Sequence, residues 1–140
     1  MASIRKEFHI EARPEEVWAA VRDVGMIHRR LVPGFVTDCR MDGSARIVSF
    51  ANGMSAREEI VDLDEQARRL VWSATGGPLT HHNASLQLFA DGEHGTRAVW
   101  IADLLPNELA APISAMIAAG ASAMQRTLAR TAGTDWRQPR

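Results

Sequence analysis

The sequence has little of what disulfide-bonded, secreted or membrane-spanning proteins require. Its 140 residues include a single cysteine, Cys39, which excludes an internal disulfide and is typical of a reducing compartment. The opening MASIRKEFHI contains no apolar signal core, and no run approaches the roughly 18 apolar residues of a membrane span. We therefore expect a cytoplasmic protein with no membrane partner.

Neither sign of charge is in excess. Sixteen Lys and Arg residues face 17 Asp and Glu residues, for a formal net charge of −1 with the signs interspersed. This balance creates no broad positive field, so nucleic acid is not an expected partner. With 46% apolar and 24% charged residues, the composition is that of a globular protein. We expect one domain over residues 1–133 and a flexible tail over 134–140.

Motifs for cofactors, nucleophiles and metals are also missing. There is no phosphate-binding loop or dinucleotide fingerprint, so no cofactor is expected. No serine lies in a nucleophile-elbow motif, and Cys39 is most simply a small core residue. His81 and His82 are neighbours on a predicted strand and point to opposite faces, so they cannot easily bind one ion. No metal site is expected from the remaining histidines, which lie on separate elements: His9, His28 and His94.

The most regular pattern lies near the C-terminus, over residues 106–130. Apolar residues recur there every three or four positions, which predicts one face of a long helix. They are Leu109, Ile113, Met116, Ile117, Gly120, Met124 and Leu128. Asn107 can cap its start, but Pro112 is discordant because a proline inside a helix removes a backbone hydrogen bond. The helix therefore either begins near Ala111 or kinks at Pro112.

The preceding chain alternates in the manner of strands. After a strand at residues 4–10, two short helices are predicted, the first starting at Pro14 and the second ending before Pro33. Six short apolar runs follow, separated by turn pairs such as Asn52-Gly53. They cover residues 35–41, 45–51, 55–63, 68–74, 81–90 and 96–105. The predicted class is α+β: a seven-stranded curved antiparallel sheet wrapped around the final helix.

This order of elements, with three of its segments, resembles the helix-grip superfamily of START-like and Bet v 1-like (SRPBCC) proteins. The segments are HIEARPEEVWAAVRDVGMIHRRLVPGF, SAREEIVDLDEQARRLVWSATGG and DLLPNELA. Within the superfamily the chain looks like a polyketide cyclase/dehydrase-type member. The resemblance implies a cavity between sheet and helix that holds an apolar small molecule. Such proteins include cyclases, dehydratases, lipid carriers, hormone receptors and non-catalytic binders, so the fold alone does not settle the chemistry.

The features of the hormone-receptor branch are absent. Where those receptors carry a lysine that grips a carboxylate, this chain has Thr37. Their proline-containing gate loop is replaced by the short Asn52-Gly53 turn, and their histidine-arginine-leucine latch is absent from GGPLTHHNAS. These departures argue against a hormone receptor.

One predicted hairpin carries a candidate polar pair. Folding it about residues 91–94 pairs Leu86 with Val99, Ala84 with Ile101 and His82 with Asp103. His82 and Asp103 would then end an apolar wall, where they could act as a general base or anchor a ligand oxygen. The alternative is a histidine satisfied by pairing at the sheet end. A register error of one residue would turn the pair outward.

Further candidates lie on the neighbouring strands and on the final helix. Glu58 is expected to face inward with Ala56 and Ile60, although the opposite parity, through Arg57, is open. The resemblance places Trp72 at an aromatic pocket position, where it could equally be a core residue. Predicted floor residues on the final helix are Ile113, Met116, Ile117, Gly120 and Met124.

Three functions fit these features. The first is an enzyme in which His82, oriented by Asp103, moves a proton on a polyketide-like or other carbonyl substrate, with Glu58 as a second polar contact. The second is a non-catalytic carrier or sensor that binds a hydrophobic or aromatic molecule through the same residues. The third is a structural or dimerising domain whose cavity is filled. A homodimer stays open in each case.

Overall fold

The structure is a computed structural model that describes residues 1–133, with side chains described through residue 129. The tail predicted over residues 134–140 lies outside this described part. The strands of the described part are β1 (Ala2–Ile10), β2 (Val36–Asp42), β3 (Ala45–Phe50), β4 (Ser55–Asp64), β5 (Arg69–Thr75), β6 (His81–Asp91) and β7 (Gly95–Leu105). Its helices are α1 (Pro14–Arg22), α2 (Ile27–Arg30), the 3₁₀ helix η1 (Asn107–Leu109) and α3 (Ala110–Gly133).

The seven strands form one antiparallel sheet in the order β1-β7-β6-β5-β4-β3-β2. Each consecutive pair from β2 to β7 is a hairpin, because turn residues separate the apolar runs. Gly43 and Gly92 occupy these turns with φ of 64° and 76°, a conformation that glycine adopts without steric cost. β1 returns to pair with β7 at one edge, with Ala2 opposite Leu104. The predicted seven-stranded antiparallel sheet, with a meander over its last six strands, is confirmed.

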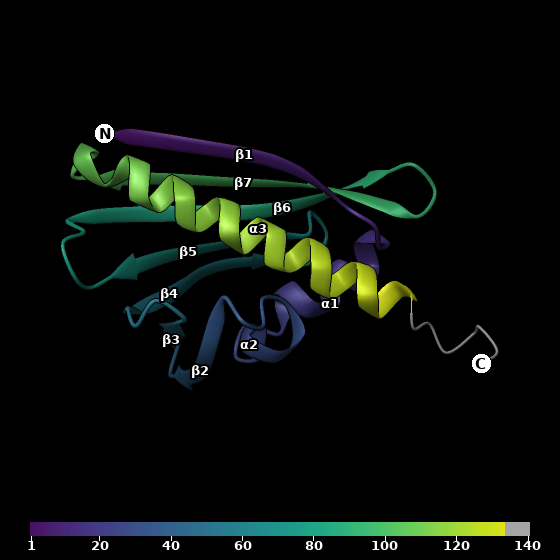
Figure 1. Cartoon of the computed structure of the whole chain (residues 1–140), viewed down its shortest axis with the longest axis horizontal. Helices are drawn as coiled ribbons and strands as arrows, with labels where there is room; N and C mark the ends of the chain where they lie inside the picture. The colour runs from purple at the N-terminus through teal and green to yellow at the C-terminus, as the bar shows by residue number, and fades with distance from the viewer. Residues whose placement is uncertain (134–140) are drawn as a thin grey trace.

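α3 lies diagonally across one face of the sheet, and the sheet curves around it (Figure 1). Ile117, Ala121, Met124 and Leu128 recur at helical spacing and are 1–4% exposed, so they form the face that packs on the sheet. This arrangement is the predicted helix grip. α2 packs beside β2, and α1 packs against β6 and β7.

The start of α3 resolves the question raised by Pro112. The chain first makes the single 3₁₀ turn of η1, in which Leu109 N–H donates to the carbonyl of Pro106 at 3.1 Å. α3 then begins at Ala110, which puts Pro112 in its first turn. Backbone N–H groups there have no partner within the helix, so proline costs little. The first alternative, a helix that begins next to the proline, is correct.

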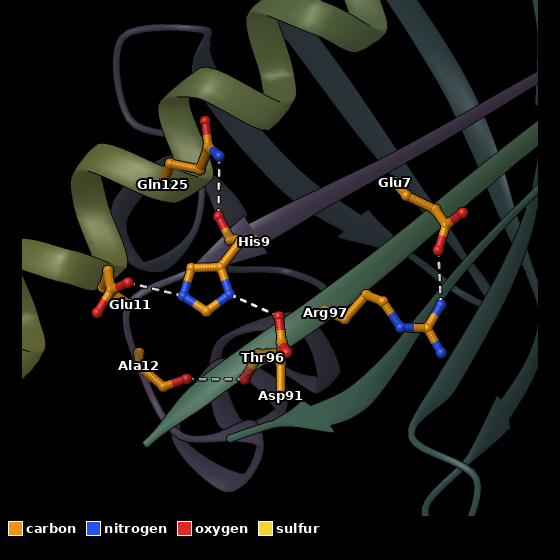
Figure 2. Close-up of polar contacts among 8 residues, drawn as sticks. All are labelled: Glu7, His9, Glu11, Ala12, Asp91, Thr96, Arg97 and Gln125. Carbon is orange, nitrogen blue, oxygen red and sulfur yellow. Dashed lines mark hydrogen bonds and ion pairs between the residues drawn. The ribbon is translucent and has the colours of Figure 1, made fainter. Parts of the chain in front are cut away.

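A cluster of polar contacts fastens β1 to the β6–β7 hairpin and to α3 (Figure 2). The His9 imidazole lies between two carboxylates, with Nδ1 2.8 Å from Asp91 and Nε2 2.7 Å from Glu11. Gln125 of α3 donates its side-chain N–H to the His9 carbonyl at 2.8 Å. Hydrogen bonding to Asp91, and then to Glu11, raises the pKa of His9 above its usual value. We call these four side chains, His9, Glu11, Asp91 and Gln125, the clasp. They are exposed or half-buried, and their contacts tie β1 to the hairpin and to α3 outside the sheet–helix interior.

No helix in the described part of the chain is long and apolar enough to cross a membrane. Cys39 is buried in the core, where burial raises the pKa of its thiol. It donates a weak hydrogen bond to the Val24 carbonyl at 3.6 Å. A thiol in this state is a packing residue.

Candidate functional site: a cavity under the final helix

A cavity of about 210 Å³ lies between α3 and the concave face of the sheet. Most of its wall is apolar, with Val48, Leu70, Leu86 and Ala102 from the sheet and Ile117 from the helix. Exposed residues also border it: Met54, Gly76, Gly77, Pro78 and Pro112. The cavity therefore reaches the surface where the β3–β4 and β5–β6 turns meet the start of α3.

A row of polar side chains crosses this apolar wall. Arg46 of β3 pairs in register with Glu58 of β4, and Glu58 pairs with Ala74 of β5. Ala74 in turn lies beside His82 of β6, through a hydrogen bond described below. Neighbouring strands are about 4.8 Å apart, so Glu58 and His82 stand roughly 10 Å apart with only a methyl group between them. Because the side chain of Ala74 is only a methyl group, space remains between Glu58 and His82 that a larger residue at position 74 would fill.

Arg46 and Glu58 form an ion pair that is almost fully removed from solvent. Arg46 Nε lies 2.8 Å from Glu58 Oε1, and the two side chains are 5% and 10% exposed. The guanidinium also donates to the Val24 carbonyl at 3.3 Å and lies over the Trp72 ring, 5.6 Å from its centroid. Each charge is thus matched, as a buried ion requires. The pair adds polarity to the cavity without adding net charge.

His82 is held in one tautomer by the backbone. The N–H of Ala74 donates to His82 Nδ1 at 2.9 Å, and the Ser73 hydroxyl donates to the His82 carbonyl at 2.6 Å. The backbone pairing of β5 with β6 ends at Trp72 and Ala84. Beyond that point these two contacts connect the strands instead. A backbone N–H can only donate, so Nδ1 accepts and the proton of the neutral ring lies on Nε2. The imidazole therefore presents Nε2–H as a hydrogen-bond donor.

The environment of His82 keeps it uncharged. Burial lowers the pKa of His82 below its usual value, because desolvation disfavours the imidazolium; nearby Glu58 opposes this effect, and His81 adds to it. A proton on Nδ1 would also face the Ala74 N–H. At neutral pH the ring is therefore a neutral donor.

The predicted pairing of His82 with Asp103 is wrong by one residue. The turn of the β6–β7 hairpin contains three residues, 92–94, because Asp91 pairs with Gly95. His82 therefore lies opposite Leu104, and Asp103 lies opposite Asn83 on the other face of the sheet. The predicted wall residues Val99 and Ile101 turn outward with Asp103, and Trp100 and Ala102 take their place beside the cavity.

The other predicted site residues lie on the inner side. Glu58 has the inward parity, and its neighbour Arg57 instead forms an exposed ion pair with Asp42. Cavity-lining residues from the predicted set are His82, Glu58, Trp72, Leu86, Ile113, Met116, Ile117 and Met124. Ala84 and Gly120 are buried on the same side but do not line the cavity. The roles of all these residues stay predictions.

Arg46 was missed by the sequence reasoning, although a signal for it exists. Its strand alternates, so Arg46, Val48 and Phe50 share one parity. A two-residue Asn52-Gly53 turn would place Arg46 opposite Glu59. The turn instead contains residues 51–53, with the Phe50 N–H donating to the Met54 carbonyl at 2.8 Å, and this places Arg46 opposite Glu58. An inward glutamate needs a positive partner, so the inward assignment of Glu58 should have prompted a search of the facing strand.

Aromatic rings complete the cavity wall. The Trp72 and Trp100 rings meet edge to face with centroids 5.9 Å apart, and Phe35 and Phe50 do the same at 5.4 Å. Gly120 of α3 permits this packing, because a Cβ there would lie 3.0 Å from the Trp100 ring. In the described part of the chain, no group of three His, Cys, Asp or Glu side chains could hold a metal ion.

A curved sheet that grips a long helix over an apolar cavity with a few polar groups defines a helix-grip protein. This chain belongs to the family described as polyketide cyclase / dehydrase and lipid transport, whose family model matches residues 1–134. Membership of this family supports ligand binding in general terms. Among curated proteins, none matches the chain in sequence.

Solved structures support the same fold. A Thermobifida fusca protein is 26% identical, with a TM-score of 0.75 over 100% of this chain and 99% of its own. A START superfamily protein from Mycobacterium smegmatis is 11% identical, with a TM-score of 0.69 over 94% and 97%. Norcoclaurine synthase from Thalictrum flavum, in complex with dopamine and hydroxybenzaldehyde, is 15% identical, with a TM-score of 0.65 over 89% and 84%. At 11% and 15% identity the last two show the fold alone.

Proposed function

We propose that this protein binds the uncharged apolar or aromatic body of a small molecule in the cavity and anchors an oxygen of that body on His82 Nε2–H. The observation that carries the proposal is the Ala74 N–H to His82 Nδ1 hydrogen bond of 2.9 Å. This bond leaves His82 Nε2–H as a fixed donor in a largely apolar wall. The charges of the two ionised side chains in that wall, Arg46 and Glu58, cancel each other. An apolar cup with a few convergent polar groups is the usual form of a small-molecule site.

The size of the cavity limits the part of the ligand that it encloses. At about 210 Å³ it exceeds an apolar cavity of about 150 Å³ that is known to hold benzene, and it is smaller than most sites for drug-sized molecules. One aromatic ring with a short substituent suits this volume. Met116 and Met124, which line the wall, have flexible side chains that adapt to different shapes.

The same geometry favours a carrier or sensor over an enzyme that uses His82 as a base. A general base needs a free lone pair. Neutral His82 has none on Nε2, which carries the proton, and its Nδ1 lone pair already accepts from Ala74. Asp103 cannot orient the ring, because it lies on the opposite face. Binding with discrimination for a hydrogen-bond acceptor is the function that these contacts support.

The proposal is tested with two probes of similar shape. Acetophenone and ethylbenzene differ in a carbonyl oxygen, so only the first can accept from His82 Nε2–H. In His82→Ala, we expect acetophenone affinity, measured by calorimetry or ligand-induced thermal stabilisation, to fall about threefold to tenfold, the range of one net hydrogen bond. Ethylbenzene affinity should stay unchanged, and His82→Gln should recover part of the loss because its amide is also a donor.

His81→Ala is the matched control. His81 is the exposed neighbour on the outer face of β6, so its removal changes the same residue type without touching the cavity. Binding of both probes should be the same as in the wild type. The proposal fails if neither probe binds, or if His82→Ala weakens both probes equally.

A further inference from the structure

A second hollow lies along the flank of α3. It is an open groove of about 410 Å³ between that helix and the segments around Gly34 and Asn52. Three of its lining residues, Phe35, Phe50 and Met116, also line the cavity. These three side chains therefore form a layer that borders both the cavity and the groove.

This layer can open without any change in the fold. Phe35, Phe50 and Met116 are each only half-buried. The two phenylalanine rings meet edge to face with their centroids 5.4 Å apart. The Met116 side chain is unbranched and has several rotatable bonds. Side chains that are partly exposed change rotamer on a picosecond to nanosecond scale. Such changes would join the two hollows into one channel.

The groove differs from the cavity in its charge. Ala115 and Ala119 form an apolar strip along the α3 flank, and Arg126 follows on the same flank. Of the described residues that line the groove, Arg126 alone is charged, and it is exposed. In the cavity, by contrast, the Arg46 charge is matched by Glu58. The groove thus runs from an apolar wall toward Arg126, which has no ion-pair partner among the described residues. The Cα of Arg126 lies about 15 Å beyond the Cα of Met116 along the helix axis.

We propose that the groove is a second subsite, which takes the chain and terminal carboxylate of an amphipathic acid whose apolar ring fills the cavity. Arg126 pairs with the carboxylate, and the chain passes between Phe35, Phe50 and Met116. This inference rests on the proposed function, because the cavity must first hold the apolar body. The ligand class is then an aromatic or other apolar group joined by a long apolar chain to an acid.

A homologous series tests the subsite. Phenylacetic, phenylbutyric, phenylhexanoic and phenyloctanoic acids are compared with their methyl esters, which have the same ring and chain without the charge. For the short members, whose acid cannot reach Arg126, the ester should bind at least as well as the acid. For the longest members, the acid should bind about twofold to fivefold tighter than its ester, as expected of an exposed ion pair. Raising the ionic strength should reduce this advantage.

Two variants assign the effect. Arg126→Gln should abolish the advantage of the long acids and leave ester affinities unchanged. Arg29→Gln removes an exposed charge from α2, outside both hollows, and should leave the advantage intact. A constant acid-to-ester ratio along the series, or an advantage that survives in Arg126→Gln, overturns the subsite while ester binding keeps the cavity proposal. If no ester binds at any length, the cavity proposal fails and the subsite fails with it.

Discussion

Removing one partner of the Arg46–Glu58 pair should be among the most destabilising single changes in this protein. In Glu58→Leu the Arg46 guanidinium would keep its place at 5% exposure and lose the carboxylate 2.8 Å away. An unpaired buried charge costs about 3–5 kcal/mol of the free energy of unfolding. Replacing both residues by apolar ones of similar volume, as Arg46→Met with Glu58→Leu, removes the uncompensated charge. The double variant should lie close to the wild type or above it.

Urea unfolding followed by circular dichroism measures these differences, and a double-mutant cycle gives the coupling between the two side chains. The chain offers a matched control in the Arg57–Asp42 pair. Its contact is as short, at 2.6 Å, but the side chains are 41% and 58% exposed. Asp42→Ala should therefore cost at most about 1 kcal/mol. If Glu58→Leu costs no more than Asp42→Ala, burial does not set the strength of the pair, and the reasoning is refuted.

Two further predictions concern the fold. The raised pKa of His9 means that the clasp stabilises the protein fully below pH 6.5 and loses its effect as pH rises through the higher folded value. The stability gap between wild type and His9→Gln should shrink with pH in thermal melts; a constant gap would contradict this. Gly120→Ala should destabilise by about 1 kcal/mol, because crowding against Trp100 outweighs the gain in helix propensity. A Gly120→Ala protein more stable than the wild type in urea would disprove the close contact.

The sequence by itself determined the elements and their order, because the signals for them are local. Alternation with turn pairs such as Asp42-Gly43 marks each hairpin, and a glycine that adopts positive φ is needed at the turn whatever the strands pack against. The helical spacing of Ile113, Ile117 and Met124 requires an apolar surface to pack against, and the predicted strands supply that surface as a sheet. These constraints together predict the grip of the sheet on α3.

Tertiary structure decided which polar groups meet. A hairpin loop of three residues or of four suits the Asp91-Gly92 turn equally well in sequence, yet the choice moves every later side chain to the other face. The three-residue loop turned Asp103 outward and left His82 inside. There, His82 meets the Ala74 N–H only because β5 and β6 separate beyond Trp72. Contacts across strands depend on register and on where a ladder ends, and both are set by the packing of the whole sheet on α3.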